Sequence, residues 1–230
     1  MVELIPGVHQ IDGVNANSYV VVEKDGSLTL IDTGMAKDGK KILNYITTKM
    51  RRNTSDVKTI VITPCHFDHV RGASELKKAT GSKLVIHQAE ADYLSGSKKA
   101  LRPKGAIGVL FSLFSPFFKF TPVEADKRLS DNDRIGSLTI VHTPGHTPGS
   151  ISLYNGERKL MFVGDTVRYL KGEIRGTPKA LSSDFKQAIQ SIQKISNFDF
   201  EVMLSGHGEP LRSNASARVK ELYRQTASYA

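Results

Sequence analysis

Four short segments constrain the fold of this chain most strongly, because each places histidine or aspartate directly after a strand-like apolar run. The segments are Thr63-Pro64-Cys65-His66-Phe67-Asp68-His69, Thr143-Pro144-Gly145-His146, Gly164-Asp165-Thr166 and Ser205-Gly206-His207-Gly208. Loops at strand ends allow side chains from distant parts of a chain to converge on one point while the sheets hold them rigid. Imidazole and carboxylate groups in such loops suit zinc, manganese or iron. Together the segments predict a metal site built on a framework of strands.

The first half of the chain predicts a β-hairpin followed by alternating helices and strands. Residues 19–23 and 28–31 form the expected hairpin, because Asp25-Gly26 between them is a strong turn signal. The spacing of apolar residues predicts a helix at 37–50. Beyond it we expect a strand at 59–62, a helix at 72–79, a strand at 83–86 and a helical turn at 89–94.

The second half repeats the pattern of strands followed by helices. Strands are expected at 138–142, 150–154 and 159–163, with Asn155-Gly156 as a hairpin turn. A helix begins near Ser183, with Ser182 or Ser183 as its N-cap, and a strand at 202–204 precedes a C-terminal helix from about residue 215. No linker rich in proline, glycine or serine separates the halves. We therefore expect a single α/β domain over residues 1–230, with helices outside two facing sheets.

Residues 95–122 differ in character from the rest of the chain. They combine basic residues and glycine with an apolar stretch at 107–120, which Pro116 and Pro122 interrupt or end. We interpret residues 95–122 as a helical insert within the domain. Its apolar part is too short and too broken to span a bilayer. Its side chains either pack onto the domain or line a pocket or a homodimer interface, and the sequence supports these interpretations equally.

The composition argues against several classes of protein. No uninterrupted apolar run of membrane-spanning length occurs, and the N-terminus lacks the pattern of a secretory signal. Cys65 is the single cysteine, which excludes an intramolecular disulfide and suits a reducing compartment. We therefore expect a cytoplasmic protein without a membrane partner. The net charge of +9 attracts anions, but its lysines and arginines are more typical of solvated surface than of a nucleic-acid site.

The order and spacing of the four segments resemble those of the metallo-β-lactamase superfamily. Its signature is His-x-His-x-Asp-His, followed by a distant His, a distant Asp and a final His. Leu30-Ile31-Asp32-Thr33-Gly34 looks like the first motif of that family, and the resemblance extends from the opening hairpin to Gly208. It implies an α/β fold, the four-layer αββα sandwich, with the metal site in the groove between the sheet edges. It also implies that Asp32 supports this site without binding metal.

The first of the family's two metal sites carries over incompletely. The resemblance implies that His66 and His146 bind the first metal, but Pro64 stands where the family has another histidine. Proline offers no side-chain donor atom and no backbone N–H, so it cannot replace that ligand. A Cys65 thiolate would be a good zinc ligand. However, neighbouring residues of an extended strand end point to opposite sides, so we expect Cys65 to face away from the side that His66 uses.

The second metal site carries over in full. The ligands that the resemblance implies for it are Asp68, His69, Asp165 and His207, with Asp165 bridging both metals. Four protein ligands are enough for one zinc-like ion. We therefore predict one tightly bound ion, zinc in the first place and iron or manganese as alternatives. A second ion is expected to bind weakly or not at all.

The resemblance implies a metal-dependent hydrolase. A metal of this kind lowers the pKa of a bound water to about 7, and the metal-bound hydroxide attacks the substrate. Asp68 is the implied catalytic residue, because in the family it also orients the attacking water. The sequences around His146 and Asp165 look most like the glyoxalase II and lactonase branches, which act on esters, thioesters, lactones and related small acyl compounds. The sequence does not identify the residues that bind the substrate.

Other functions remain open at this point. The short segment after His207 leaves no room for the added C-terminal domain of glyoxalase II, which disfavours a glutathione thioester. Pro64 raises the alternative of a catalytically degraded member kept for metal binding or structure, although a degraded site has no reason to retain His66 and His146. A nucleic-acid phosphodiesterase ranks third, because this chain has little room for the long recognition segments of the RNA-cutting branches.

Overall fold

The computed structural model describes residues 2–11, 16–98 and 120–229, and the chain divides into two compact units. Among the described residues, unit 1 comprises 2–11, 16–98, 120–129 and 135–137. Unit 2 comprises 130–134 and 138–229. The helical insert predicted at residues 95–122 lies mostly outside the described residues. Within the described part of the chain, no helix is long and apolar enough to cross a membrane.

Unit 1 is built on a seven-stranded sheet whose strands follow one another in chain order. The strands are β1 (Val2–Ile5), β2 (Val8–Ile11), β3 (Ser18–Val22), β4 (Leu28–Ile31), β5 (Val57–Ile62), β6 (Lys83–His87) and β7 (Lys127–Leu129). Strands β1 to β4 pair antiparallel, which includes the predicted hairpin, and β4 to β7 pair parallel. Because β4, β5 and β6 run in the same direction, their carboxyl ends lie at one edge of the sheet.

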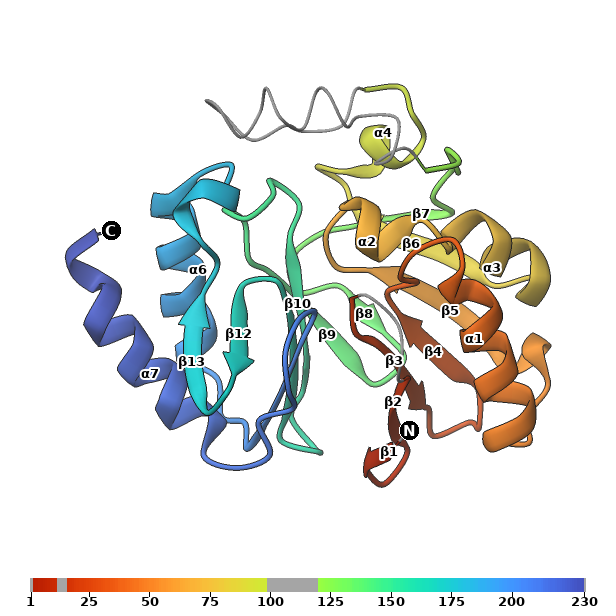
Figure 1. The fold of residues 1–230 in the computed structure, drawn as a ribbon, viewed down its shortest axis with the longest axis horizontal. Helices are drawn as coiled ribbons and strands as arrows, with labels where there is room; N and C mark the ends of the chain where they lie inside the picture. Colours follow the sequence, from red (N-terminus) through yellow and green to blue (C-terminus); the bar gives the residue numbers. More distant parts are fainter. Residues whose placement is uncertain (1, 12–15, 99–119, 230) are drawn as a thin grey trace. The chain divides into compact units, whose positions relative to one another are not determined.

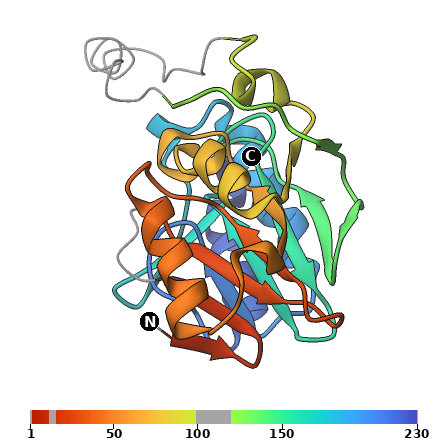
Figure 2. The same cartoon turned by 90° about the vertical axis from the view of Figure 1, so that its right-hand side faces the viewer.

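Helices cover one face of this sheet. The helical segments are α1 (Asp38–Asn44), continued by the π-helical turn η1 (Tyr45–Lys49), η2 (Thr54–Asp56), α2 (Phe67–Val70), α3 (Ala73–Thr80) and α4 (Ala91–Leu94). Helices α1 and α3 lie on the same side of the sheet (Figures 1 and 2). Ile42 of α1 and Leu76 of α3 are fully buried against strand residues such as Ile60. Complete burial of a side chain of this size contributes about 1.5–3 kcal/mol, so this apolar layer stabilises unit 1 substantially.

Unit 2 contains a five-stranded sheet and a two-stranded hairpin. The sheet has the order β14-β11-β10-β9-β8, with β8 (Arg134–Ile135), β9 (Leu138–His142), β10 (Ile151–Asn155), β11 (Leu160–Gly164) and β14 (Val202–Ser205). Strand β10 pairs antiparallel with β9 and β11, while β11 pairs parallel with β14. Strands β9, β11 and β14 therefore run in one direction. The hairpin consists of β12 (Val167–Leu170) and β13 (Glu173–Gly176).

Two long helices contribute apolar side chains to the core of unit 2. They are α6 (Phe185–Ser196) and α7 (Ala215–Thr226), which lie side by side next to the β12–β13 hairpin (Figure 1). The short helices η4 (Lys179–Leu181) and η5 (Ala227–Tyr229) precede α6 and follow α7. Ile192 of α6 and Val219 of α7 share one buried cluster with Met161 of β11. The apolar spacing that predicts these helices therefore reflects their burial.

The described residues confirm a mixed α/β fold with several sheets, and most predicted elements are present within a few residues of their expected bounds. One prediction was wrong: the N-cap of α6 is Asp184, whose side chain accepts the backbone N–H of Gln187. The hydroxyl of Ser183 instead donates to the carbonyl of Gly145, and that of Ser182 to the carbonyl of Pro178. The two serines bind backbone carbonyls before the helix, and the Asp184 carboxylate accepts one of the free backbone N–H groups at its start.

Candidate metal centre

In unit 1, the predicted site residues lie at the carboxyl ends of neighbouring parallel strands. Asp32 follows β4, and the segment from Thr63 to His69 follows β5. His66 is the N-cap residue of the short helix α2, while Asp68 and His69 lie within it. The strand order thus brings Asp32 close to the segment with His66, Asp68 and His69, although more than thirty positions separate them in sequence. This edge is where open α/β sheets place their ligand sites.

The carboxylate of Asp32 organises this edge through three hydrogen bonds. Its Oδ1 accepts the backbone N–H of Thr63 at 2.8 Å. Its Oδ2 accepts the hydroxyl of Thr63 at 2.6 Å and lies 2.9 Å from Nδ1 of His69. Asp32 has a positive φ of 57°, and both it and His69 are buried. A carboxylate on one ring nitrogen fixes the tautomer and orientation of an imidazole, so that Nε2 of His69 is the nitrogen available to a metal.

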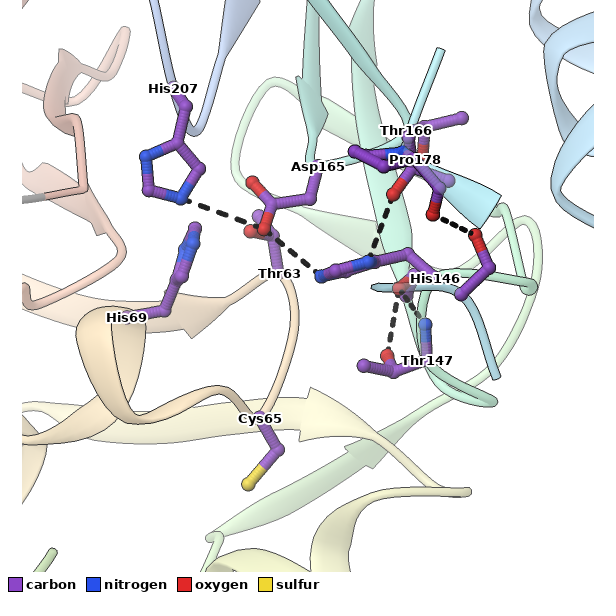
Figure 3. Close-up of polar contacts among 12 residues, drawn as sticks. Thr63, Cys65, His69, His146, Thr147, Asp165, Thr166, Pro178 and His207 are labelled. Atoms are coloured by element: carbon purple, nitrogen blue, oxygen red, sulfur yellow. Dashed lines mark hydrogen bonds and ion pairs between the residues drawn. The ribbon is translucent and has the colours of Figure 1, made fainter. Parts of the chain in front are cut away.

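Pro64 and Cys65 form the turn between β5 and α2. The backbone N–H of Cys65 donates to Oε2 of the buried Glu90 at 2.8 Å, which holds the turn from the neighbouring strand end. The side chain of Cys65 packs in the apolar core of unit 1 and points away from His69 (Figure 3). Burial raises the pKa of this thiol, and the nearby Glu90 carboxylate raises it further. Cys65 is therefore placed as a core residue, as the alternation of side chains predicts.

In unit 2, the three remaining predicted ligands also follow parallel strands. His146 lies beyond the end of β9, Asp165 directly follows β11, and His207 follows β14. The loops after β11 and β14 are joined by a hydrogen bond of 2.7 Å from the N–H of Gly206 to the carbonyl of Gly164. Asp165 and His207 thus come together because their strands are neighbours in the sheet.

The imidazoles of His146 and His207 both lie close to one carboxylate oxygen of Asp165. Oδ2 of Asp165 lies 3.1 Å from Nε2 of His146 and 3.7 Å from Nε2 of His207. Figure 3 shows both imidazoles pointing at this carboxylate. His146 and Asp165 are buried, whereas His207 is about one-third exposed, so the cluster has one side open to solvent. Two histidines and a carboxylate gathered in this way are a typical metal-binding arrangement.

The spacing of these donor atoms suits a metal ligand set. With ligand bonds of 2.0–2.2 Å, two donors of one tetrahedral ion are about 3.4 Å apart. The two separations of 3.1 and 3.7 Å to Oδ2 of Asp165 lie on either side of this value. Imidazole and carboxylate donors are also the groups that zinc, iron and manganese accept. The residues of unit 2 therefore fit a divalent metal. In unit 1, the contact of Asp32 with Nδ1 of His69 is typical of a metal-binding histidine, whose second ring nitrogen binds the metal.

Thr177 is a residue of this centre that the sequence did not identify. Its hydroxyl lies 3.0 Å from Nδ1 of His146. The other ring nitrogen of His146, Nε2, is directed at Asp165 (Figure 3). The backbone N–H of Thr177 also donates to the carbonyl of Thr166, which closes the base of the β12–β13 hairpin. A turn signal at Lys171-Gly172, between strands with alternating apolar residues, could have revealed this hairpin.

The loop that carries His146 is held from the other side by the start of α6. The backbone N–H groups of Ser183 and Asp184 donate to the carbonyls of His146 and Gly145. Gly145 has a φ of +131°, and a Cβ atom at this position would lie 2.2 Å from the backbone nitrogen of Ala188. Only glycine allows the helix and the loop to approach so closely. The position of His146 is therefore determined by long-range packing.

We expect Thr177→Val to weaken metal binding by about 10- to 100-fold while leaving the fold intact. Removing a group that hydrogen-bonds to the other ring nitrogen of a metal-binding histidine typically has effects of this size. Valine has nearly the shape of threonine, so packing is preserved and only the hydroxyl on His146 is removed. Metal affinity is measured by competition with a chelator. Thr139→Val, a replacement on β9 away from the ligands, is the matched control. Equal affinities in both variants would contradict a positioning role for Thr177.

Three other histidines, His9, His87 and His142, lie outside the ligand segments and have contacts typical of structural residues. His9 lies 3.0 Å from the hydroxyl of Tyr45, and His87 accepts the backbone N–H of Ala89. Nε2 of His142 lies 2.9 Å from the carbonyl of Pro148 in the loop that follows His146. These contacts agree with the interpretation of the three histidines as structural residues.

Comparison with known proteins finds relatives that match most of this chain. The sequence profile of the metallo-beta-lactamase superfamily matches residues 11–207. The "Probable metallo-hydrolase YflN" of Bacillus subtilis is 28% identical over 98% of this chain and 93% of its own length. A "Hydroxyacylglutathione hydrolase" of Bartonella tribocorum is 28% identical over 84% of this chain, and the match spans 62% of that protein.

Solved structures show the same fold at lower sequence identity. A metallo-beta-lactamase of Cronobacter sakazakii is 18% identical and matches with a TM-score of 0.74 over 99% of this chain and 91% of that one. TTHA1623 in a di-iron-bound form is 21% identical, with a TM-score of 0.68 over 92% and 96% of the two chains. The class B3 di-zinc metallo-beta-lactamase LRA-12 from an Alaskan soil metagenome is 20% identical, with a TM-score of 0.69 over 96% and 89%.

Proposed function

Because this chain belongs to the metallo-beta-lactamase superfamily, we propose that it is a metal-dependent hydrolase of esters, thioesters or lactones. The proposed metal ligands are His66, Asp68, His69, His146, Asp165 and His207. The observation that carries the proposal is the convergence of two imidazole nitrogens on one carboxylate oxygen of Asp165 at 3.1 and 3.7 Å. Two imidazoles and a carboxylate are groups that a divalent cation such as zinc accepts as ligands.

We expect the two metal sites of the family to be unequal in this chain. Pro64 occupies the position of a ligand histidine and offers no donor atom. Cys65 does not compensate, because its thiol packs in the core of unit 1. Asp68, His69, Asp165 and His207 form a complete set for one ion, whereas His66, His146 and the bridging Asp165 hold a second ion weakly. Zinc or iron is the expected metal, since solved structures of this fold contain one or the other.

The bound metal supplies a water whose pKa is lowered to about 7 and polarises the carbonyl of the substrate. The side chains of this chain contribute binding, orientation and proton transfer. Asp68 is partly exposed at the start of α2, so its carboxylate is placed to accept a hydrogen bond from the attacking water and then its proton. The Asp32 carboxylate holds His69 in one orientation throughout. The Thr177 hydroxyl does the same for His146.

The choice of acyl substrates is supported by the relative named hydroxyacylglutathione hydrolase, which shares 28% of its aligned residues with this chain. That protein is considerably longer, and the match covers 62% of it. We therefore propose the bond class, an activated acyl bond, and not glutathione as the group that is recognised. Nucleic acid is not a proposed substrate, and the partner of this site is a small acyl compound.

A metal analysis followed by a substrate panel tests the proposed function. We expect purified protein to contain about one tightly bound metal per chain, as four complete ligands allow. Lactones, thioesters, aryl esters and phosphodiesters are then assayed with and without a chelator, and we expect turnover of acyl substrates that the chelator abolishes. If no substrate is turned over with zinc, iron or manganese added, the chain is instead a metal-binding member that has lost catalysis.

Pro64→His is expected to raise the metal content from about one to about two ions per chain, because it restores the missing imidazole of the first site. Metal content is measured after dialysis against metal-free buffer. Pro64→Ala is the matched control: it relieves the constraint of proline without adding a donor, so its metal content should stay at about one. Two tightly bound ions in the unmodified protein would overturn the assignment of an incomplete first site.

A further inference from the structure

The β12–β13 hairpin of unit 2 begins two residues after the ligand Asp165 and has two different faces. Its pairing places Val167 opposite Gly176 and Tyr169 opposite Ile174, and these residues pack towards α6, α7 and the core of unit 2. Because side chains alternate along a strand, the other face carries the remaining residues. They are Arg168 and Leu170 of β12 and Glu173 and Arg175 of β13.

This second face borders the loops that carry the metal ligands. Tyr169 forms a bridge with Gly208, and the N–H of Glu209 donates to the carbonyl of Tyr169. The side chain of Leu170 lies so close to Gly208 that a Cβ atom there would be 3.0 Å from its Cδ2. Gly208 directly follows the ligand His207. Arg168 shares the face of Leu170 and is two residues nearer to Asp165, whose Cα is at most about 11 Å away along the chain.

The two arginines on this face, Arg168 and Arg175, differ in their exposure to solvent and in their hydrogen-bond partners. Register places Arg168 directly opposite Arg175, a like-charge pair that is unfavourable in a sheet. Arg175 is exposed and forms an ion pair with Glu173. Arg168 is half-buried, and its buried Nε makes no hydrogen bond to any described residue. A buried donor without an acceptor costs free energy, and in functional sites such a donor often has a ligand as its acceptor.

We propose that Arg168 binds an anionic group of the substrate, a carboxylate or a phosphate located near the acyl bond that is cleaved. This inference rests on the proposed function, because it assigns a substrate class to the same site. The planar guanidinium offers several N–H donors in a fixed geometry that matches the two oxygens of such a group. Bound there, the anion accepts a hydrogen bond from the Nε–H of Arg168. The substrate is thus an anionic acyl compound.

The decisive measurement is the preference of the enzyme between two matched substrates. One is a neutral thioester or aryl ester, and the other is the same compound with a terminal carboxylate or, in a separate arm, a terminal phosphate. We expect Arg168→Gln to lower the ratio of kcat/KM for the anionic over the neutral substrate by roughly 10- to 100-fold, the effect of one charge-assisted hydrogen-bonded pair. Arg168→Lys should recover part of this ratio, because it keeps the charge and loses the bidentate geometry.

Arg175→Gln is the matched control. It removes the same charge from the same face of the hairpin, but from an arginine that is paired with Glu173, so the ratio should be unchanged. A comparison of the carboxylate and phosphate arms shows which anion is preferred. An equal loss in both glutamine variants would indicate general attraction of anions and overturn the proposal. An unchanged ratio in Arg168→Gln would overturn it as well.

Failure of the proposed function is distinguishable from failure of this inference. If the metal-loaded protein turns over neither substrate of any pair, hydrolysis is refuted, and binding is then measured directly by calorimetric titration with inorganic phosphate and with succinate. Binding of either anion by the unmodified protein and by Arg175→Gln, but at least 10-fold weaker binding by Arg168→Gln, supports an anion site at Arg168. Equal binding by all three proteins refutes it.

Discussion

Replacing His207 with alanine is expected to remove the tightly bound metal and to lower kcat/KM by at least about 1000-fold, or about 4 kcal/mol of transition-state stabilisation. His207 is one of four ligands in the complete set, and Oδ2 of Asp165 lies 3.7 Å from its Nε2. Loss of this imidazole leaves three protein ligands, and the lowered pKa of the attacking water depends on the metal being held. Asp68→Ala should have an equal or larger effect, because it also removes the proposed proton acceptor. Metal content per chain and kcat/KM on the best acyl substrate are the measurements.

Two variants serve as controls for this experiment. His142→Ala removes an imidazole whose Nε2 contacts the carbonyl of Pro148 and not a ligand, so the metal should be retained. Cys65→Ala removes a core thiol and should retain the metal as well, at a modest cost in stability. Retention of metal and activity by His207→Ala would contradict the proposed ligand set. Loss of metal from Cys65→Ala would show that the thiol is a ligand.

Asp32→Ala is expected to lower the free energy of unfolding by about 3–5 kcal/mol, because it leaves buried polar donors without their acceptor. The carboxylate accepts both the backbone N–H and the hydroxyl of Thr63 and lies against Nδ1 of the fully buried His69. The free energy is measured by urea unfolding of the metal-free protein, so that loss of metal does not contribute. In the metal-loaded protein, the same variant should bind metal at least 10-fold more weakly.

The matched control for Asp32 is Asp25→Ala in the turn of the β3–β4 hairpin. Asp25 also accepts a backbone N–H and a hydroxyl, both from Ser27, but it is exposed. Water can replace its hydrogen bonds, so the expected loss is about 1 kcal/mol or less. If the two alanine variants were equally stable, burial of the Asp32 network would not contribute to the stability of unit 1.

Much of this protein could be predicted from its sequence because the signals are local. The Asp25-Gly26 turn between alternating apolar runs predicted the β3–β4 hairpin, and the apolar spacing of 185–195 predicted α6. The metal-ligand segments could be recognised because each follows a strand and contains the residue types that bind metals. Asp32 was identified as a supporting residue from its motif, and its contact with His69 agrees with that expectation.

Short strands and polar partners were harder to predict. Strands β12 and β13 are four residues each, so only a few apolar residues mark the alternation that identifies a strand. The N-cap of α6 was misplaced because serine and aspartate are equally good caps. The choice fell to Asp184 because the adjacent serine hydroxyl is engaged by the carbonyl of Gly145, a contact between residues far apart in sequence. Only the fold brings that carbonyl to the start of the helix.

The sequence by itself determined the family and the types and order of the residues proposed to bind metal, with Pro64 where the resemblance implies a histidine, since these depend on which side chains are present and in what order. The tertiary structure decided how they are held. Thr177 contacts His146 only because the β12–β13 hairpin brings Thr177 back next to Thr166. Glu90 contacts the turn at Cys65 only because β6 lies next to β5. Arg168 differs from Arg175 for the same reason, because strand register and burial, not residue type, distinguish two arginines on one face.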